Sequence, residues 1–217
     1  MIISILINMP LLIEPHYFPC ISYFASLVQT DQLLLEVNEF YIKQTYRNRC
    51  YIRAANQIDR LSVPVSNAHK GARLKDIRVD YSQRWQQVHW GAIFSAYGNS
   101  PFYEHLKDEI HAIIFRKYDF LIDLSIETLT LCLKFLKVNI PIDITSVYQK
   151  SYGNEVQDLR NAFTPNNQSP THVYPTYQQI FGSEFVPNLS ILDLLFCMGN
   201  YSMPYLQEVT KLKVLNF

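Results

Sequence analysis

A cationic segment in the first half of the chain has the clearest chemical potential. Residues 41–49 read Tyr-Ile-Lys-Gln-Thr-Tyr-Arg-Asn-Arg. If the segment is extended, alternate side chains point to opposite faces, so Lys43, Arg47 and Arg49 share one face and Asn48 lies on the other. Cations on one face repel each other unless an anion or acidic side chains lie among them, and guanidiniums suit carboxylate or phosphate oxygens. The segment predicts an anion-binding site; a solvated strand face paired with acidic residues is the alternative.

A histidine lies on the apolar stripe of a predicted helix. The stripe runs through positions 85, 89, 92 and 96, so Trp85 and His89 face the core rather than water. A buried imidazole can act as a general base near neutral pH. The alternative is a core histidine that is hydrogen-bonded to a backbone carbonyl. His89 is the candidate catalytic residue, and Trp85 is a candidate for substrate binding.

Aromatic and amide side chains at turns supply further candidates for substrate binding. Residues 15–19, Pro-His-Tyr-Phe-Pro, follow an apolar run, and ligands of α/β folds bind where strands end. A rigid turn with no further role explains these residues equally well. Tyr17, Tyr97 and Tyr177 are candidates to stack on a sugar or base. Gln178 is grouped with Tyr177, although both could simply close the fold.

Other patterns indicate structure or the absence of a common site. Ser190 followed by Asp193 is close to a capping box, so a structural role is predicted for both. The chain has no phosphate-binding loop, no dinucleotide fingerprint and no cysteine–histidine pattern with metal spacing. No cofactor or metal is therefore predicted, and a small-molecule substrate is the expected partner.

Composition limits the classes of protein further. Lys and Arg together number 19, as do Asp and Glu, and this balance argues against a nucleic-acid partner. The four cysteines are scattered, which fits a reducing compartment, and we expect the protein in the cytoplasm. No charge-free apolar run of about 18 residues is present, so membrane insertion is not expected. Composition leaves the oligomeric state open.

The elements that must position these residues follow from periodicity and turn signals. Strands are predicted over Ile2–Ile7, Leu33–Val37, Tyr41–Ile52, Ile58–Val65 and Leu74–Val79. Helices are predicted over Ser22–Gln29, Gln83–Tyr97 with Ser82 as N-cap, Pro101–Phe115 with Ser100 as N-cap, Ser125–Lys137 and Ile191–Met198. The fold class is therefore α+β: a mixed sheet mostly from the N-terminal half, packed by helices mostly from the C-terminal half. No linker divides the chain, so residues 1–217 are predicted to form one domain.

Several of these segments, taken in order, resemble the WbqC-like protein family. The matching pieces are residues 15–19, 46–49, 61–65, 75–77, 85 with 89, 96–97 with 100–102, and 185–196. The family's opening motif usually begins with a histidine, a position that Ile13 occupies here. The resemblance spans nearly the whole chain and favours Arg47, Arg49 and His89 as site residues, because they match polar positions of the family pattern.

The resemblance implies a role in assembling a bacterial surface polysaccharide, O-antigen or capsule. The leading hypothesis is a transferase that moves an acyl or aminoacyl group to a nucleotide-activated sugar. His89 would be its base, and Lys43, Arg47 and Arg49 would hold a diphosphate or carboxylate. A non-catalytic protein that binds a nucleotide sugar or glycan intermediate is the alternative, as is a scaffold of a polysaccharide enzyme complex. The sequence leaves open whether the protein is an enzyme.

Overall fold

The largest described sheet is parallel throughout. The computed structural model describes residues 9–165 and 173–211. Within them the sheet has the order β7-β2-β1-β8, and each neighbouring pair of strands is parallel. Its strands are β1 (Leu11–Ile13), β2 (Leu33–Leu35), β7 (Ile142–Ile144) and β8 (Gln157–Asp158). All three residues of β1 are buried, as is usual for an apolar strand covered on both faces.

Two small antiparallel pairs accompany the parallel sheet. Two of the predicted strands pair in part: β3 (Arg49–Arg53) and β4 (Ile58–Ser62) form a hairpin, and its turn is closed by the Ala54 N–H, which donates to the Gln57 carbonyl. The second pair consists of β5 (Val65–Ser66) and β6 (Arg78–Val79). Parallel and antiparallel sheets together with the helices confirm the predicted α+β class.

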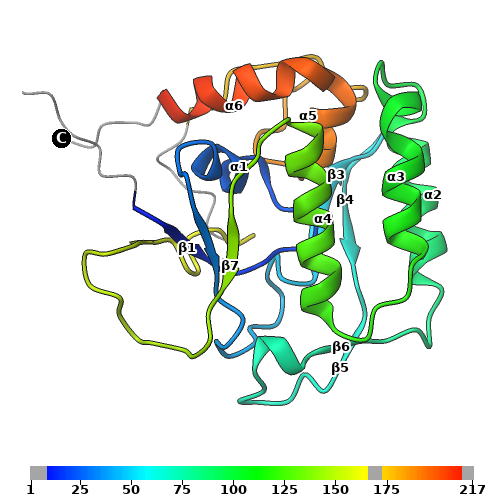
Figure 1. Cartoon of the computed structure of the whole chain (residues 1–217). Coiled ribbons are helices and arrows are strands. Elements are labelled where there is room, and N and C mark those ends of the chain that lie inside the picture. The colour runs from blue at the N-terminus through cyan, green and yellow to red at the C-terminus, as the bar shows by residue number, and fades with distance from the viewer. Residues whose placement is uncertain (1–8, 166–172, 212–217) are drawn as a thin grey trace, which may run out of the picture.

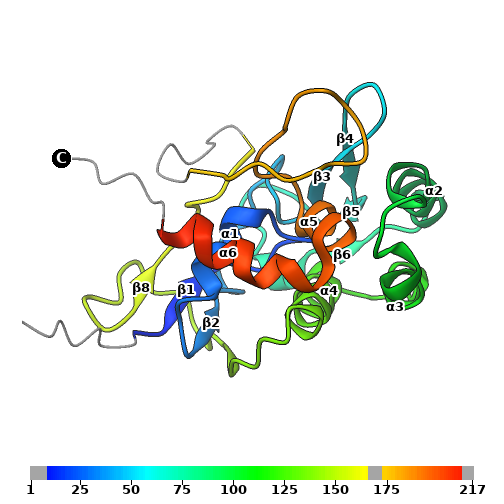
Figure 2. The same cartoon turned by 90° about the horizontal axis from the view of Figure 1, so that it is seen from above.

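Helices surround the sheets. They are α1 (Ile21–Leu27), α2 (Trp85–Tyr97), α3 (Tyr103–Phe115), α4 (Leu121–Phe135), α5 (Ile191–Met198) and α6 (Ser202–Lys211), with 3-10 turns η1 (Leu74–Asp76) and η2 (Gly199–Tyr201). Helix α6 lies against α1, and α2 packs beside α3 at the end of the molecule away from β1 and β8 (Figures 1 and 2). The buried apolar side chains of these elements form one continuous cluster.

The predicted strand over Tyr41–Ile52 is correct only in its last part. Strand β3 begins at Arg49, and residues 43–48 form turns. The Thr45 hydroxyl donates to the Ile42 carbonyl (2.8 Å), and Gln44 has a positive φ of 63°. The turns bring Arg47 to buried acidic partners, which an extended segment would not do. The prediction that Lys43, Arg47 and Arg49 share one face of a strand is therefore wrong.

Other elements depart from prediction at their ends. Ser82 does not cap α2, because the helix begins three residues later and Arg84 occupies the N-cap position. Helix α3 starts at Tyr103 instead of Pro101, and α4 starts at Leu121 instead of Ser125. The predicted strand Leu74–Val79 is η1 followed by β6, and α6 was not predicted. Helix α5 matches its prediction at both ends, whereas the predicted strand Ile2–Ile7 lies outside the described residues.

Candidate functional site

Polar residues follow the strands of the parallel sheet at one edge. Glu14 follows β1, Glu36 follows β2 and Thr145 follows β7, while Arg160 and Asn161 come just after β8. Because the strands are parallel, their carboxyl ends meet at the same edge. The chain passes from β1 to β2 on one side and later reaches β8 on the other side of β1. Ligand sites of open parallel sheets lie at such a reversal of strand order.

A buried arginine joins two carboxylates at this edge. Arg47 is fully buried, and its Nε and Nη2 atoms lie 2.7 and 2.5 Å from Oε1 of Glu39. The same Nη2 lies 3.4 Å from Oε1 of Glu14, which is also fully buried. We call Glu14, Glu39 and Arg47 the carboxylate–arginine cluster. Burying three ionised groups is costly unless they pair, so the cluster must be held by further hydrogen bonds.

Neighbouring groups supply those hydrogen bonds. Asn161, at the surface, donates its backbone N–H to Oε2 of Glu14 (3.0 Å) and accepts from Nη2 of Arg47 through its side chain (2.8 Å). Arg47 also donates Nη1–H to the Thr45 hydroxyl (3.2 Å). Nε2 of His16 lies 3.0 Å from Oε1 of Glu14, while its buried Nδ1 has no partner among the described residues. One bare imidazole nitrogen therefore remains beside the cluster.

The two carboxyls of the cluster differ in proton affinity. Burial opposes ionisation of Glu14, but the hydrogen bond from His16 and the charge of Arg47 outweigh it and hold its pKa below the usual range. Burial raises the pKa of Glu39 to about 7; the charge of Arg47 opposes this rise and the charge of Glu14 adds to it. Separated pKa values in one site are typical of paired acids with different roles. Glu39 can thus exchange a proton near neutral pH while Glu14 stays ionised.

A second polar group at the same edge surrounds Glu36. Its Oε1 accepts from the Asn38 N–H and from the Thr145 hydroxyl, each at 2.8 Å. Nη1 of Arg160 lies 3.3 Å from Oε2 of Glu36, and Nη2 of Arg160 lies 2.6 Å from Asp158. These contacts tie the ends of β2, β7 and β8 together. They hold the edge against which the carboxylate–arginine cluster packs.

The raised pKa of Glu39 predicts a measurable pH dependence of stability. Glu39 binds its proton more tightly in the folded than in the unfolded chain, so its contribution is present below pH 4.5 and is lost as pH rises through about 7. Each tenfold change in proton affinity is worth about 1.4 kcal/mol, so the contribution is roughly 3 kcal/mol. Burial lowers the pKa of His89 to about 4, so the contribution of His89 to stability changes with pH in the opposite direction. The effect of Glu39 must therefore be measured as the difference in stability between wild type and Glu39→Gln. Urea unfolding at pH 5 and pH 8 should show Glu39→Gln gaining stability relative to wild type at the higher pH. A difference that does not change with pH contradicts the raised pKa.

Of the predicted cationic segment, only Arg47 joins the cluster. Lys43 is exposed, and Asn48 donates its amide to the Val63 carbonyl (2.9 Å). Arg49 is half-buried at the start of β3, and its Nε has no hydrogen-bond partner among residues 9–165 and 173–211. The four side chains therefore do not line one surface.

Tyr17, His89 and Trp85 form a separate group. The Tyr17 hydroxyl lies 3.0 Å from Nδ1 of His89, and Nε2 of His89 lies 3.2 Å from the Ser62 carbonyl. A carbonyl only accepts, so Nε2 carries the proton and Nδ1 accepts from Tyr17. The rings of Trp85 and His89 are 5.1 Å apart, edge to face. Both nitrogens of His89 are thus engaged, and no described hydrogen bond or ring contact links it to Arg47.

Tyr97 and Tyr177 form a third group, around Asp193. Their hydroxyls donate to the two oxygens of this fully buried carboxylate, at 2.8 and 2.5 Å, and Gln179 donates to it at 2.9 Å. The neighbouring Gln178 is exposed and lies with Tyr177 beside a surface cavity of about 410 Å³. Ser190 caps α5 as predicted, by accepting from the Leu192 N–H. Asp193 does not complete a capping box, because the Ser190 N–H donates to the Tyr51 carbonyl (2.8 Å) and the Asp193 carboxylate accepts from Tyr97, Tyr177 and Gln179 instead.

The sequence reasoning missed most of the residues at the sheet edge. One signal could have indicated the sheet edge: an acidic residue directly after a short apolar run, as Glu36 follows β2. Glu14 lies beside the proline turn that was predicted as a ligand position. No comparable signal exists for Arg160 and Asn161, because β8 is a two-residue polar strand.

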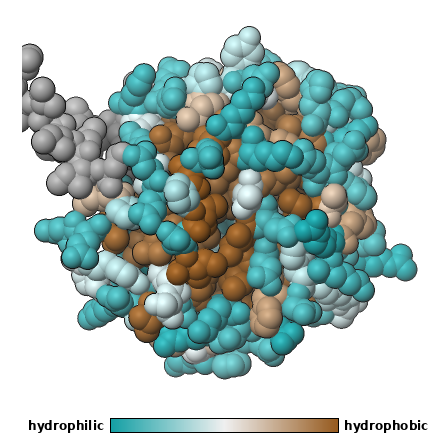
Figure 3. All heavy atoms as spheres, viewed as in Figure 1, coloured by the Kyte–Doolittle hydropathy of each residue, from teal (hydrophilic) through white to brown (hydrophobic). Residues whose placement is uncertain are grey.

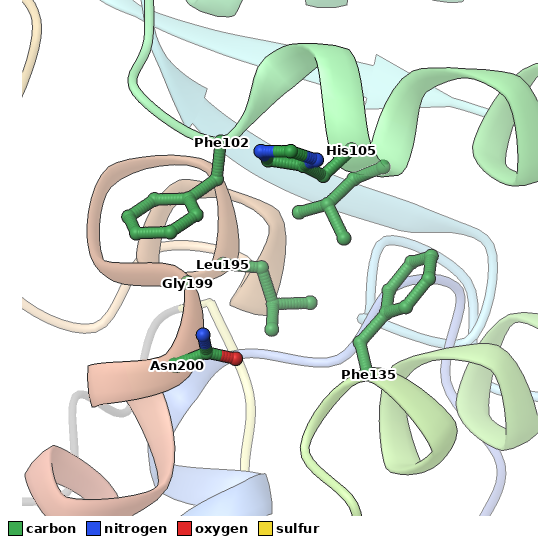
Figure 4. A pocket seen from close by; sticks show the side chains of 7 residues that line it. Phe102, His105, Phe135, Leu195, Gly199 and Asn200 are labelled. Atoms are coloured by element: carbon green, nitrogen blue, oxygen red, sulfur yellow. The ribbon is translucent and has the colours of Figure 1, made fainter.

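Surface cavities lie elsewhere on the described protein. One is lined mainly by apolar side chains from α3, α4 and α5, with His105 and Asn200 at opposite sides of it (Figure 4). Another, of about 310 Å³, is lined by Trp85 and His89 together with Arg60 and Arg84. Apolar side chains also gather in the middle of the face that carries β7 and α4, between hydrophilic residues (Figure 3).

The described residues contain neither a membrane-spanning helix nor a group of metal ligands. None of the described helices is both long enough and apolar enough to cross a membrane. Within residues 9–165 and 173–211, no three His, Cys, Asp or Glu side chains are grouped so that they could hold a metal ion. Arginines and hydrogen bonds hold the ionisable groups of the sheet edge.

Fold and site together define an α+β protein with buried ionisable groups at the carboxyl edge of a parallel sheet. The chain belongs to the WbqC-like protein family, whose model matches residues 14–167 and 161–205. It is also similar to the uncharacterized protein Rv1507c of Mycobacterium tuberculosis, with 20% identity over 224 residues that cover 90% of this chain and 96% of that protein. No solved structure gives a significant match. The family resemblance predicted from the motifs is thus confirmed.

Proposed function

We propose that this protein is a transferase that moves an acyl or aminoacyl group to a nucleotide-activated sugar during assembly of a bacterial surface polysaccharide. The observation that carries the proposal is the carboxylate–arginine cluster, in which one arginine holds a carboxylate that stays ionised and a second carboxyl that titrates near neutral pH. Membership of the WbqC-like family supports the setting. The four cysteines are free and buried, which supports a cytoplasmic location.

In this proposal Glu39 is the general base. Its ionised carboxylate takes a proton from an amine or hydroxyl of the sugar as that atom bonds to the acyl carbon. The bond from the acyl carbon to its leaving group breaks, and the leaving group receives the proton from Glu39. A base with a pKa near the working pH suits such a two-way transfer. Arg47 binds Glu39 and keeps the carboxyl in place, and Asn161 covers the cluster from the surface.

Glu39 fits the role of base better than His89. The proton of Nε2 in His89 is directed to the Ser62 carbonyl, and Nδ1 already accepts from the buried Tyr17 hydroxyl. Burial also lowers the pKa of His89 to about 4, so it is a weak base at neutral pH. Glu39 is also buried, but its pKa of about 7 suits proton exchange near neutral pH.

The test begins with a thermal-shift screen against nucleotide sugars and acyl donors. A ligand at about 100 times its dissociation constant adds roughly 2.7 kcal/mol of stability, which is easily detected. Stabilising pairs are then incubated with the protein, and the acylated sugar is sought by mass spectrometry. We expect Glu39→Gln, which mimics the protonated acid, to fold normally and to lose about 100-fold in turnover. Glu127→Gln, at a half-buried carboxylate that pairs with Arg116 away from the cluster, is the matched control.

The outcomes separate the alternatives. Turnover that survives in Glu39→Gln but is lost in His89→Gln would move the base to His89. Binding without any product, and with equal affinity in the wild type and Glu39→Gln, would instead indicate a non-catalytic protein that binds a nucleotide sugar or glycan intermediate. If no small molecule binds, the scaffold alternative gains support from the apolar face seen in Figure 3.

A further inference from the structure

We infer that the cavity at the N-terminus of α2 is a binding site for an organic phosphate, a phosphate group carried on a ring. The cavity has a volume of about 310 Å³. Its lining joins the end of β4 to the first turns of α2 and includes Arg60, Ser62, Arg84, Trp85 and His89. The inference rests on this cavity alone and does not depend on the carboxylate–arginine cluster or on the proposed transferase activity.

The helix end that opens on this cavity has no side-chain cap. Arg84 occupies the N-cap position of α2 and makes no capping hydrogen bond. Ser82, which the sequence predicted as the cap, lies two residues before the N-cap position, in a turn where its N–H donates to the Asp80 carboxylate. The first N–H groups of a helix have no partner within the helix, and their dipoles favour an anion. A phosphate oxygen can accept from these groups where no side chain does.

Two arginines beside the helix end add positive charge without internal partners. Both Arg60 and Arg84 are exposed, and neither side chain makes a hydrogen bond or ion pair with another described residue. No acidic residue is among those that line the cavity. Asp80 contacts the lining residue Pro64 only through its backbone, because the Asp80 N–H donates to the Pro64 carbonyl (2.9 Å). The Asp80 carboxylate accepts from the Ser82 N–H. The guanidinium groups are thus available to a phosphate, whose oxygens they bind in pairs.

Two buried polar atoms of the lining residues also have no partner. Trp85 is only 3% exposed, and its Nε1–H has no hydrogen-bond partner among the described residues; the same is true of Oγ of Ser62. Buried polar atoms of native proteins are nearly always hydrogen-bonded, so an unpartnered donor beside a cavity indicates a missing acceptor. The indole N–H can only donate, which again indicates an acceptor-rich ligand.

The remaining lining residues favour a ring beside the phosphate. Leu61, Pro64, Val88 and the indole of Trp85 are apolar surfaces of the cavity. Aromatic faces stack well on sugars and bases. His89 closes the wall in a fixed orientation, since Tyr17 and the Ser62 carbonyl bind its two nitrogens. An inorganic phosphate would satisfy the charges but not cover the apolar side.

Intrinsic fluorescence gives a direct test, because the chain has two tryptophans, Trp85 and Trp90. In Trp90→Phe, the signal comes from Trp85 alone. This variant is titrated with uridine diphosphate and glucose 1-phosphate, and with uridine, glucose and inorganic phosphate for comparison. We expect the organic phosphates to change the fluorescence with a dissociation constant below about 1 mM, and the neutral compounds to have no effect. Inorganic phosphate should bind at least about tenfold more weakly.

Variants locate the site. Arg60→Gln and Arg84→Gln should each weaken binding about tenfold, as loss of a charge-assisted hydrogen bond implies. Lys150→Gln makes the same charge change at an exposed position that does not line this cavity, and should have no effect. Trp85→Phe keeps an aromatic ring but removes the N–H, so calorimetry should show weaker binding with unchanged circular dichroism.

Three results would overturn the inference. They are the absence of binding by either organic phosphate, equal binding of uridine or glucose, and binding that Arg60→Gln and Arg84→Gln leave unchanged. Phosphate binding does not require catalysis, so a protein that binds glucose 1-phosphate here but transfers no acyl group would reject only the proposed function. If Arg84→Gln still transfers the acyl group and binds the organic phosphate with unchanged affinity, only this phosphate site would be rejected.

Discussion

Replacing Arg47 by methionine should lower the free energy of unfolding by about 3–5 kcal/mol at pH 7, because it leaves buried carboxylates without their cation. Glu14 and Glu39 both lie against this guanidinium. Methionine keeps much of the volume, so the loss reports on charge more than on packing. Urea unfolding followed by circular dichroism measures it. The matched control is Arg60→Met, an exposed arginine without an internal partner, which should change stability by less than about 0.5 kcal/mol.

The same variant should respond to pH in a defined direction. Without Arg47, the carboxyls of Glu14 and Glu39 lose their charge when they are protonated. The difference in the free energy of unfolding between Arg47→Met and wild type should therefore shrink as pH falls toward 5. A loss below about 1 kcal/mol at pH 7 would show that both carboxyls are already neutral, which contradicts the ionised state that we assign to Glu14. A loss that stays constant with pH would assign the effect to packing.

Replacing Asp193 by alanine should cost a similar amount, about 3–5 kcal/mol, because buried donors that lose their acceptor cost about 1–3 kcal/mol each. The hydroxyls of Tyr97 and Tyr177 and the amide of Gln179 all donate to this carboxylate. Asp193→Asn, which keeps one accepting oxygen, should lose less. Thermal or urea unfolding of the two variants gives the comparison.

A matched control exists for the position of Asp193 in its helix. Asp123 also lies in the first turn of a helix, α4, but is exposed. Asp123→Ala removes only the interaction of a charge with the helix end, worth about 0.3–1 kcal/mol. If Asp193→Ala were no more harmful than Asp123→Ala, the three hydrogen bonds would be unimportant to stability. Tyr97 and Tyr177 would then be free for the substrate contacts that the sequence predicted.

Local features of the fold were predictable because neighbouring residues decide them. Helix α5 begins after Ser190 and ends before Gly199 as predicted, since a capping hydroxyl and a glycine at positive φ mark its ends. The β3–β4 hairpin follows from two runs of β-forming residues around a turn. The starts of α3 at Tyr103 and of α4 at Leu121 were harder to predict, because no side chain caps either helix.

For Arg47 the structure agrees with the alternative that acidic residues pair with the arginine, whereas the predicted anion-binding site stays a prediction. The proposal of an arginine that needs acidic partners or an anion agrees with the fully buried Arg47 between Glu14 and Glu39. Periodicity could not supply these partners, because Glu14 and Asn161 are far apart in the chain. Nor could it show that His89 meets Tyr17, a contact between residues 72 positions apart.

The amino-acid sequence by itself determined the α+β class, the family, the hairpin and the presence of a cation in need of negative partners, since each depends on residues close together or on an ordered set of motifs. Only the tertiary structure decided which side chains share a site. Pairing of parallel strands brings distant strand ends to one edge, and burial there raises the pKa of Glu39 while Glu14 stays ionised. Electrostatic interactions of this kind depend on distance and burial, which exist only once the chain is folded.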